Sequence, residues 1–252
     1  MTIMYAPPSP RRGLHRLAVD ALGLRIVQGE LPAGSVLPSE AELSLSLDMS
    51  RTVIREALKV LASKGLVESR PKTGTRVLPR AHWKLIDADV LGWQFDAGAD
   101  PDFLRSITEV RSIIEPRAAG LAAVRRTEGE MARLEQLLAR MGDTIENRPA
   151  YIAADLELHA EILQATHNEL LTQMTGTLTV ALQAAREVTT QIPGGMSAAM
   201  AIHRAVVEAI RDRDEALATC AMADLVDTAA RDAEEILGRD SVRSVLAPRA
   251  AG

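Results

Sequence analysis

LPSEAELSLSLDMSRTVIREALKVLASKGLV, residues 37–67, contains the start signals of two helices with a tight turn between them. Ser39 stands three residues before Glu42, the spacing of a capping box, which supplies acceptors for the free backbone N–H groups at a helix start. Ser50 precedes a second run with apolar residues at helical spacing, which ends at Gly65. The stretch therefore predicts a helix-turn-helix.

The side chains at the start of its second helix have the chemistry that DNA reading requires. Short polar groups and guanidinium groups reach phosphates and base edges when a helix end enters the major groove. Behind this helix, two short β-prone runs flank a Pro-Lys-Thr-Gly turn, which predicts a hairpin wing with a basic tip. The candidate DNA contacts are Ser50, Arg51, Thr52 and Arg55 on the helix, and Arg70, Lys72, Thr73 and Arg76 on the wing. A solvated basic turn is the alternative for the wing.

The charge distribution is typical of a basic nucleic-acid-binding domain joined to an acidic domain of another kind. The chain has 252 residues and a net charge of −5, but its first 80 residues hold 12 Lys and Arg against 7 Asp and Glu, and the remainder is acidic. Its single cysteine excludes an intramolecular disulfide, and no apolar run is long enough for a signal peptide core or a membrane span. We expect a cytoplasmic protein with no membrane partner.

The second half predicts helices only. Apolar residues recur at helical spacing in six segments after residue 100, with an interruption or kink at Pro116. The predicted fold class is mainly α, with an N-terminal winged helix-turn-helix and a C-terminal all-α antiparallel bundle. The predicted boundaries are 1–11 for a disordered lead, 12–79 for the winged domain, 80–99 for a linker, 100–238 for the bundle and 239–252 for a loose tail.

Three residues of the bundle have metal-ligand chemistry. Asp155 and His159 lie four apart, so they share one helix face, and His203 stands among residues that look inward. One carboxylate and two imidazoles suit a borderline divalent ion. From the spacing alone, a salt bridge or a buried structural histidine is the more frequent explanation. A metal-dependent hydrolase is a further alternative, although no general base or oxyanion stabiliser stands at useful spacing.

The motifs also carry a family resemblance. The run GELPAGSVLPSEAEL, the helix SRTVIREAL and the segment GLVESRPKTGTRV resemble the winged-helix domain of GntR-type bacterial transcription regulators. EVRSIIEPRAAGLAA, DLELHAEILQATHNELL and IHRAVVEAIRDRDEALATCAM resemble, in the same order, the helical FCD ligand-binding domain of the FadR-like branch. The resemblance is strongest to sugar-acid regulators of that branch, which implies a homodimeric repressor that leaves its operator DNA when it binds a small carboxylate such as an aldonate.

The resemblance also implies roles for particular residues. Asp155, His159 and His203 match metal-binding positions, with zinc the first expectation and nickel or manganese as alternatives. The family's final histidine is missing, because Leu225 stands at its position and Asp224 is one residue out of register. The metal then has three protein ligands, or Asp224 substitutes, or the metal is weak or absent.

The candidate effector-binding residues are Arg111, Arg186, Gln183 and Asn168. A guanidinium such as that of Arg111 can grip a carboxylate with two parallel hydrogen bonds, but it could equally form a surface pair with Glu115. Asn168 also fits a helix cap. A regulator that responds to acyl thioesters or other organic acids without a metal remains the alternative function, and it would require an apolar cavity.

Overall fold

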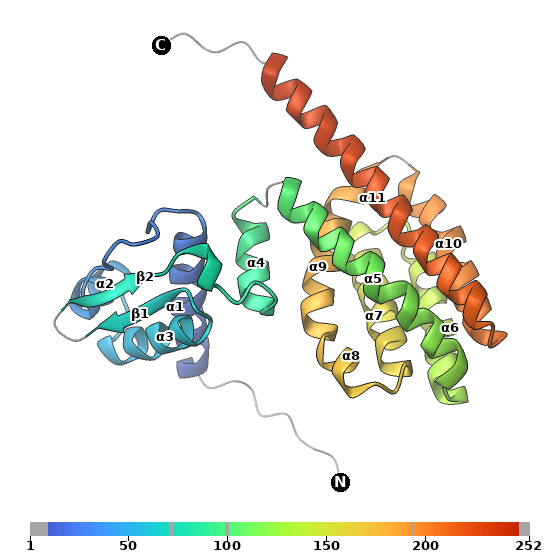
Figure 1. The fold of residues 1–252 in the computed structure, drawn as a ribbon, viewed down its shortest axis with the longest axis horizontal. Coiled ribbons are helices and arrows are strands. Elements are labelled where there is room, and N and C mark those ends of the chain that lie inside the picture. Colours follow the sequence, from blue (N-terminus) through green and yellow to red (C-terminus); the bar gives the residue numbers. More distant parts are fainter. Residues whose placement is uncertain (1–9, 71–72, 99–100, 193, 247–252) are drawn as a thin grey trace. The chain divides into compact units, whose positions relative to one another are not determined.

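The computed structural model describes residues 10–70, 73–98, 101–192 and 194–246, and the chain divides into two compact units, Met1–Ala99 and Asp100–Gly252 (Figure 1). Each unit has a hydrophobic core of its own. The first is a winged helix-turn-helix and the second is helical throughout its described part, so the predicted fold class is confirmed. Among the described helices, none combines the length and the apolar character of a membrane-crossing segment.

The helices of the first unit begin where local capping predicts them. Its elements are α1 (Pro10–Val27), α2 (Glu40–Ser46), α3 (Arg51–Ser63), β1 (Val67–Arg70), β2 (Gly74–Val77), η1 (Arg80–His82) and α4 (Ala88–Asp96). The Ser39 backbone N–H donates to Glu42 Oε2 at 2.8 Å, and Ser50 Oγ accepts from the backbone N–H of Val53 at 3.3 Å. Ile54 and Leu61 are fully buried in the core that α3 shares with α1.

The wing is a two-stranded antiparallel hairpin. Its register runs from Val67 opposite Val77 to Arg70 opposite Gly74, and Val36 adds an isolated bridge to Arg76. Lys72 of the predicted basic tip lies outside the described residues.

Residues 80–99 do not form the predicted linker. Trp93 of α4 is only 3% exposed, and its ring N–H donates to Asp20 of α1 at 3.1 Å. Gly23 leaves room for this ring, because a Cβ atom at Gly23 would lie 2.6 Å from it. Trp83 also stays within the first unit, where its ring N–H donates to the Leu78 carbonyl oxygen at 3.0 Å. Burial of aromatic surface against α1 therefore folds this segment onto the winged domain.

The second unit is an antiparallel assembly around α5 and α7 (Figure 1). Its helices are α5 (Pro101–Arg125), α6 (Glu128–Asp143), α7 (Arg148–Ala165), α8 (Glu169–Gln173), α9 (Thr175–Thr189), α10 (Gly195–Arg211) and α11 (Glu215–Leu246). Contacts between α5 and α11 are the most extensive, and Gly120 permits their close approach because an added Cβ would lie 2.4 Å from Thr219 Oγ1.

Three helix boundaries in this unit differ from the predictions. First, α5 runs without interruption through the buried Pro116, since packing along 25 residues outweighs one missing backbone hydrogen bond. Second, seven described helices replace the six predicted segments, because α8 and α9 are separate helices that meet at Met174. Third, α11 continues to Leu246, eight residues beyond the predicted end of the bundle at 238.

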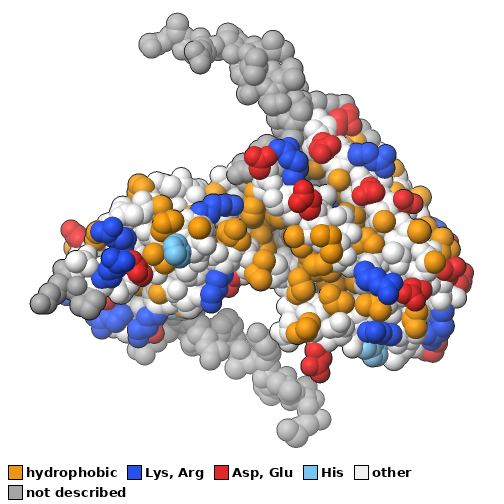
Figure 2. All heavy atoms as spheres, in the orientation of Figure 1, with side chains coloured by type: hydrophobic (Ala, Val, Ile, Leu, Met, Phe, Trp, Pro, Cys, Tyr) orange, Lys and Arg blue, Asp and Glu red, His pale blue; other side chains and the backbone are white. Residues whose placement is uncertain are grey.

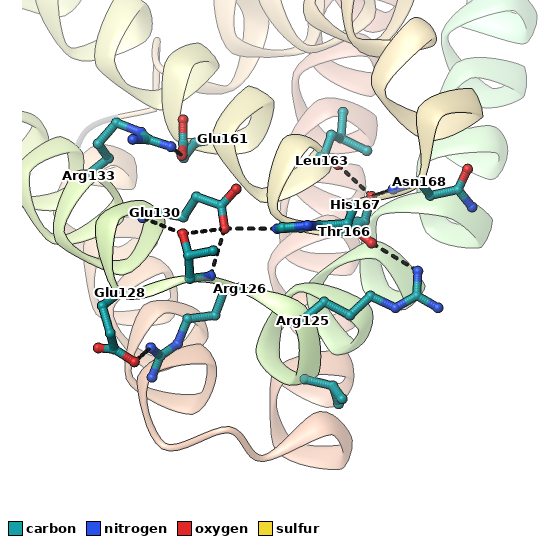
Figure 3. Close-up of polar contacts among 12 residues, drawn as sticks. Arg125, Arg126, Glu128, Glu130, Arg133, Glu161, Leu163, Thr166, His167 and Asn168 are labelled. Carbon is teal, nitrogen blue, oxygen red and sulfur yellow. Dashed lines mark hydrogen bonds and ion pairs between the residues drawn. The ribbon is translucent and has the colours of Figure 1, made fainter.

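A polar network joins the start of α6 to the junction between α7 and α8 (Figure 3). Glu130 Oε2 accepts from the Thr127 backbone N–H at 2.7 Å and lies 3.0 Å from His167 Nε2. Arg125 Nη1 donates to the Thr166 carbonyl oxygen at 2.9 Å. Partial burial raises the pKa of Glu130, but the Thr127 backbone N–H, the His167 ring and the Thr127 hydroxyl together lower it from 4.5 to about 2.

This network predicts a contribution of Glu130 to acid stability. Because its pKa is lower in the folded chain, the carboxylate stabilises the fold above pH 4.5, and this stabilisation is lost as the pH falls from 4.5 to about 2. Urea unfolding of Glu130→Gln should show a lower midpoint than the wild type at pH 7, and the difference should shrink at pH 3. Glu135→Gln, at an exposed position of α6, is the control and should follow the wild type. A constant difference across this pH range would contradict the assignment.

Candidate functional site

The candidate DNA contacts of the first unit stand at its surface. Arg51, Thr52, Arg70, Thr73 and Arg76 are all exposed. Arg55 is exposed as well, although its guanidinium donates to Glu40 at 2.7 Å, and Ser50 is the N-cap of α3. These side chains are available to phosphates and base edges, whereas the apolar face of α3 is used by the core.

The three candidate metal ligands come together inside the second unit. Asp155 and His159 lie one turn apart on α7, and α10 brings His203 beside them. Each is at most 2% exposed, and one ligand atom from each lies within 4.8 Å of the others. Asp155 Oδ1 is 2.8 Å from His203 Nε2 and 3.9 Å from His159 Nε2.

The outer nitrogens of both imidazoles are oriented by acceptors. His203 Nδ1 lies 2.8 Å from the Ala199 carbonyl oxygen, and His159 Nδ1 lies 3.0 Å from Glu115 Oε2. A carbonyl or carboxylate oxygen only accepts hydrogen bonds, so both contacts favour the proton on Nδ1 and leave the lone pair on Nε2. Burial lowers the pKa of His203 and favours its neutral form, although Asp155 opposes this.

The inward-facing atoms of this cluster have the chemistry of metal ligands. Among the described residues, Asp155 Oδ1, His159 Nε2 and His203 Nε2 are buried without a hydrogen-bond partner. All three are acceptors in the protonation states given above, and buried acceptors that face one another are costly. A shared divalent ion would satisfy them together, so the residues fit a metal.

Two buried arginines supply the counter-charges. Arg186 Nε donates to Asp155 Oδ2 and Arg111 Nε donates to Glu115 Oε1, both at 2.7 Å. Burial raises the pKa of Asp155, but the Arg186 guanidinium holds it well below its ordinary value. Burial likewise opposes ionisation of Glu115, but Arg111 and His159 lower its pKa to about 2. Both carboxylates are therefore ionised.

Glu115 is the residue of this buried cluster that the sequence does not single out. It was considered only as a surface partner of Arg111, whereas both residues are at most 3% exposed and the carboxylate also orients His159. The four-residue spacing identified the pair correctly. Its burial depends on how α5 packs in the bundle, which local spacing does not reveal.

Small cavities flank the cluster. One of about 20 Å³ has polar side chains in its wall, from Tyr151, Arg186, Thr189, Thr190, Thr228 and Asp232, beside apolar residues that form most of its surface. Another of about 10 Å³ lies beside Glu115 and His159, and its wall is apolar, with Leu178, Leu182 and Met222. Each has room for about one water molecule. In this conformation the bundle is closed, and a larger ligand requires helices to move apart.

Several predicted residues take no part in the site. Gln183 is exposed, and Asn168 caps α8 by accepting from the backbone N–H groups of Leu170 and Leu171. Neither residue lies at the buried cluster in this structure, and their roles in effector binding stay predictions. Asp224 is exposed while Leu225 is buried, so no fourth protein ligand comes from this turn of α11.

Comparisons with known proteins identify both units. Residues 14–77 match the gntR family of bacterial regulatory proteins, and residues 106–228 match the FCD domain. The chain is 34% identical to the galactonate operon transcriptional repressor of Escherichia coli (strain K12), over 86% of this chain and 96% of the relative. It is 32% identical to the putative L-lactate dehydrogenase operon regulatory protein of the same strain, over 80% and 78%.

The fold recurs in solved structures. The structure titled "Lar controls the expression of the Listeria monocytogenes agr system and mediates virulence" superposes with a TM-score of 0.63, at 15% identity over 92% of this chain and all of that one. At this identity the likeness concerns the fold alone.

The buried ion pair predicts a large effect of neutralising Asp155. Asp155→Asn would leave the Arg186 guanidinium buried without its counter-charge, which should lower the free energy of unfolding by about 3–5 kcal/mol. Urea denaturation at pH 7 with a chelator would measure this in the absence of metal. The double variant Asp155→Asn/Arg186→Met removes the unpaired charge and should recover most of the loss. A double variant no more stable than the single one would contradict the proposed charge balance.

Proposed function

Because the chain belongs to the gntR family of bacterial regulatory proteins and carries an FCD domain, we propose that it represses a sugar-acid catabolic operon in the cytoplasm and leaves the operator when a small carboxylate binds. The family match and the regulators that the chain resembles already show that it is a DNA-binding transcriptional regulator and not an enzyme. The observation that supports release by a small carboxylate is the buried cluster of Asp155, His159 and His203, whose acceptor atoms have no hydrogen-bond partner among the described residues.

In this function the winged unit reads the operator. The start of α3 would enter the major groove, where Arg51 and Thr52 reach base edges and Arg55 reaches phosphates. The wing residues Arg70, Lys72, Thr73 and Arg76 would follow the adjacent backbone. Phosphate contacts of this kind make the affinity fall steeply with salt.

Asp155, His159 and His203 would hold a divalent ion, with zinc the first expectation. When bound, the ion supplies a Lewis-acidic position for oxygen atoms of the effector. Glu115 and the Ala199 carbonyl would hold the two imidazoles in the orientation and tautomer that a ligand requires. With only three protein ligands, positions remain for water or effector oxygens.

The charges of the site favour an anionic effector. The ionised groups Asp155, Glu115, Arg111 and Arg186 cancel one another, so a divalent cation leaves an excess of two positive charges in a buried place. Arg111 and Arg186 each keep an Nη2 group that has no hydrogen-bond partner among the described residues. A carboxylate would offset the charge and accept from these donors.

The hydroxyl and carboxylate groups at the larger cavity support a hydroxylated acid rather than an acyl thioester as the effector. Tyr151, Thr189, Thr190 and Thr228 carry hydroxyl groups and Asp232 carries a carboxylate, all suited to the hydroxyl groups of an aldonate. The apolar cavity beside His159 is the observation that favours the metal-free alternative, but it is the smaller of the two. Entry of either ligand requires opening, and the backbone at His167 and Gly194, with φ of 50° and 77°, brackets α8 and α9 as the segment to move.

The proposal also includes a homodimer, in which two winged units meet the two halves of a palindromic operator. Effector binding would favour an arrangement of the helical units in which the winged units no longer match their half-sites. A coupling of only about 1–3 kcal/mol changes occupancy substantially.

Two single substitutions should separate the DNA site from the metal site. His203→Ala should abolish the Zn²⁺-dependent rise in melting temperature and the additional rise with galactonate, and leave operator affinity within about twofold. Arg51→Ala should do the reverse, lowering operator affinity by about tenfold or more in fluorescence anisotropy while zinc binding stays intact. An effector response that persists in His203→Ala and in the presence of chelator would support the metal-free regulator instead.

A further inference from the structure

The outward face of α5 carries large apolar side chains that the described chain leaves uncovered. Val110, Ile113 and Val124 are 46%, 74% and 52% exposed, and Leu217 at the start of α11 is 53% exposed. Val110, Ile113 and Val124 stand at the spacing of a single helix face, which also carries the charged Arg117. The three apolar residues are called the apolar stripe of α5. Figure 2 shows hydrophobic side chains gathered over the region where Figure 1 places α5. Contiguous apolar surface of this kind marks an interaction site.

The opposite face of the same helix builds the metal and effector site. Arg111 directly follows Val110 in the sequence, and Glu115 lies two residues after Ile113, yet both are at most 3% exposed. At 100° per residue, Arg111 and Glu115 lie on the far side of α5 from the apolar stripe. One rigid helix therefore connects the buried site with an unpartnered surface.

We propose that this stripe binds the α5 stripe of a second copy of the chain, with the two helices antiparallel and related by a two-fold axis near Ile113. An isologous contact requires a self-complementary patch, and charge supplies it here. The exposed Glu109 lies four residues before Ile113 and the exposed Arg117 four residues after it. In an antiparallel pair centred near Ile113, each Arg117 comes beside the Glu109 of the other copy, so opposite charges flank an apolar centre.

The length of α5 is sufficient for an interface with a second copy of the chain. A helix of 25 residues is about 38 Å long, and Leu217 of α11 widens the apolar surface at one end. A stable interface of about 800 Å² per partner needs a face of that extent with aliphatic residues at its centre and charges at its edge. The inference rests on the proposed homodimer and adds where its helical units meet. It also gives the effector a direct route, because a displacement of Arg111 and Glu115 moves the dimer contact with them.

The test is the oligomeric state of the full chain by sedimentation velocity. Ile113→Asp places a charge at the centre of the contact and should raise the dimer dissociation constant by about 100-fold or more, giving monomers at micromolar concentration. Leu170→Asp is the matched control, because Leu170 is 77% exposed on α8 and outside the stripe, and it should stay dimeric. Circular dichroism should show both variants folded.

A charge exchange tests the arrangement itself. Glu109→Arg and Arg117→Glu should each weaken the dimer by about tenfold, and the double variant should recover to within about threefold of the wild type. Glu109 and Arg117 are eight residues apart on one helix, about 12 Å, so recovery can only come from contact between copies. Arg117 also pairs with Glu215 of its own chain, a contact that the double variant does not restore.

The outcomes separate this inference from the proposed function. A dimeric Ile113→Asp variant, a monomeric Leu170→Asp variant, or a double variant as weak as the single ones would overturn the α5 interface. Zn²⁺ binding by Ile113→Asp, measured by calorimetry, should remain as in the wild type, because His159 and His203 are untouched. If the wild type did not bind Zn²⁺, the proposed metal site would be wrong. The interface test would remain valid, because it measures only the oligomeric state.

Discussion

The carboxylate of Asp155 is the interaction on which the second unit depends. One oxygen accepts from Arg186 of α9 at 2.7 Å, and the other lies 2.8 Å from His203 of α10. Through His159 and Glu115 the same cluster reaches α5. A fully buried ion cannot be left without partners, since its desolvation costs several kcal/mol. The contacts of Asp155 with Arg186 and of Glu115 with His159 therefore join α5, α7 and α9 with defined geometry, in addition to apolar packing. A cation shared with His203 would join α10 to them.

The features that sequence reading predicted are those decided within a few residues of the chain. Ser39 with Glu42, and Ser50 before its helix, fix α2 and α3 because a capping hydrogen bond spans three residues. The same holds for Asp155 and His159, which one helix turn brings together. Their meeting with His203 required a partner 44 residues away, and here the family resemblance supplied what spacing alone left open.

The features that the sequence does not predict depend on tertiary packing. Nothing near Trp93 indicates that it fits against Gly23, 70 residues earlier, so residues 80–99 resembled a linker. Gln183 and Arg186 both looked able to line a cavity from α9, but only Arg186 has a buried counter-charge to hold it inward. Pro116 was read as a helix breaker by its local cost, which packing of α5 against α11 and α7 exceeds.

The closed state of the bundle determines how an effector could act. Because the cavities hold about one water molecule each, the proposed effector would bind an open conformation that is a minor population of the free protein. The apparent affinity for the effector is then the affinity of the open form multiplied by the fraction of molecules that are open. To change the ratio of open to closed molecules from 1:99 to 99:1, the effector must bind the open form about 5.5 kcal/mol more strongly than the closed form. Buried groups with partnerless atoms are a source of that preference. Arg111, Arg186 and the acceptors of the cluster gain contacts only when a ligand or ion reaches them. The same atoms that make the closed bundle costly would therefore favour the proposed opening.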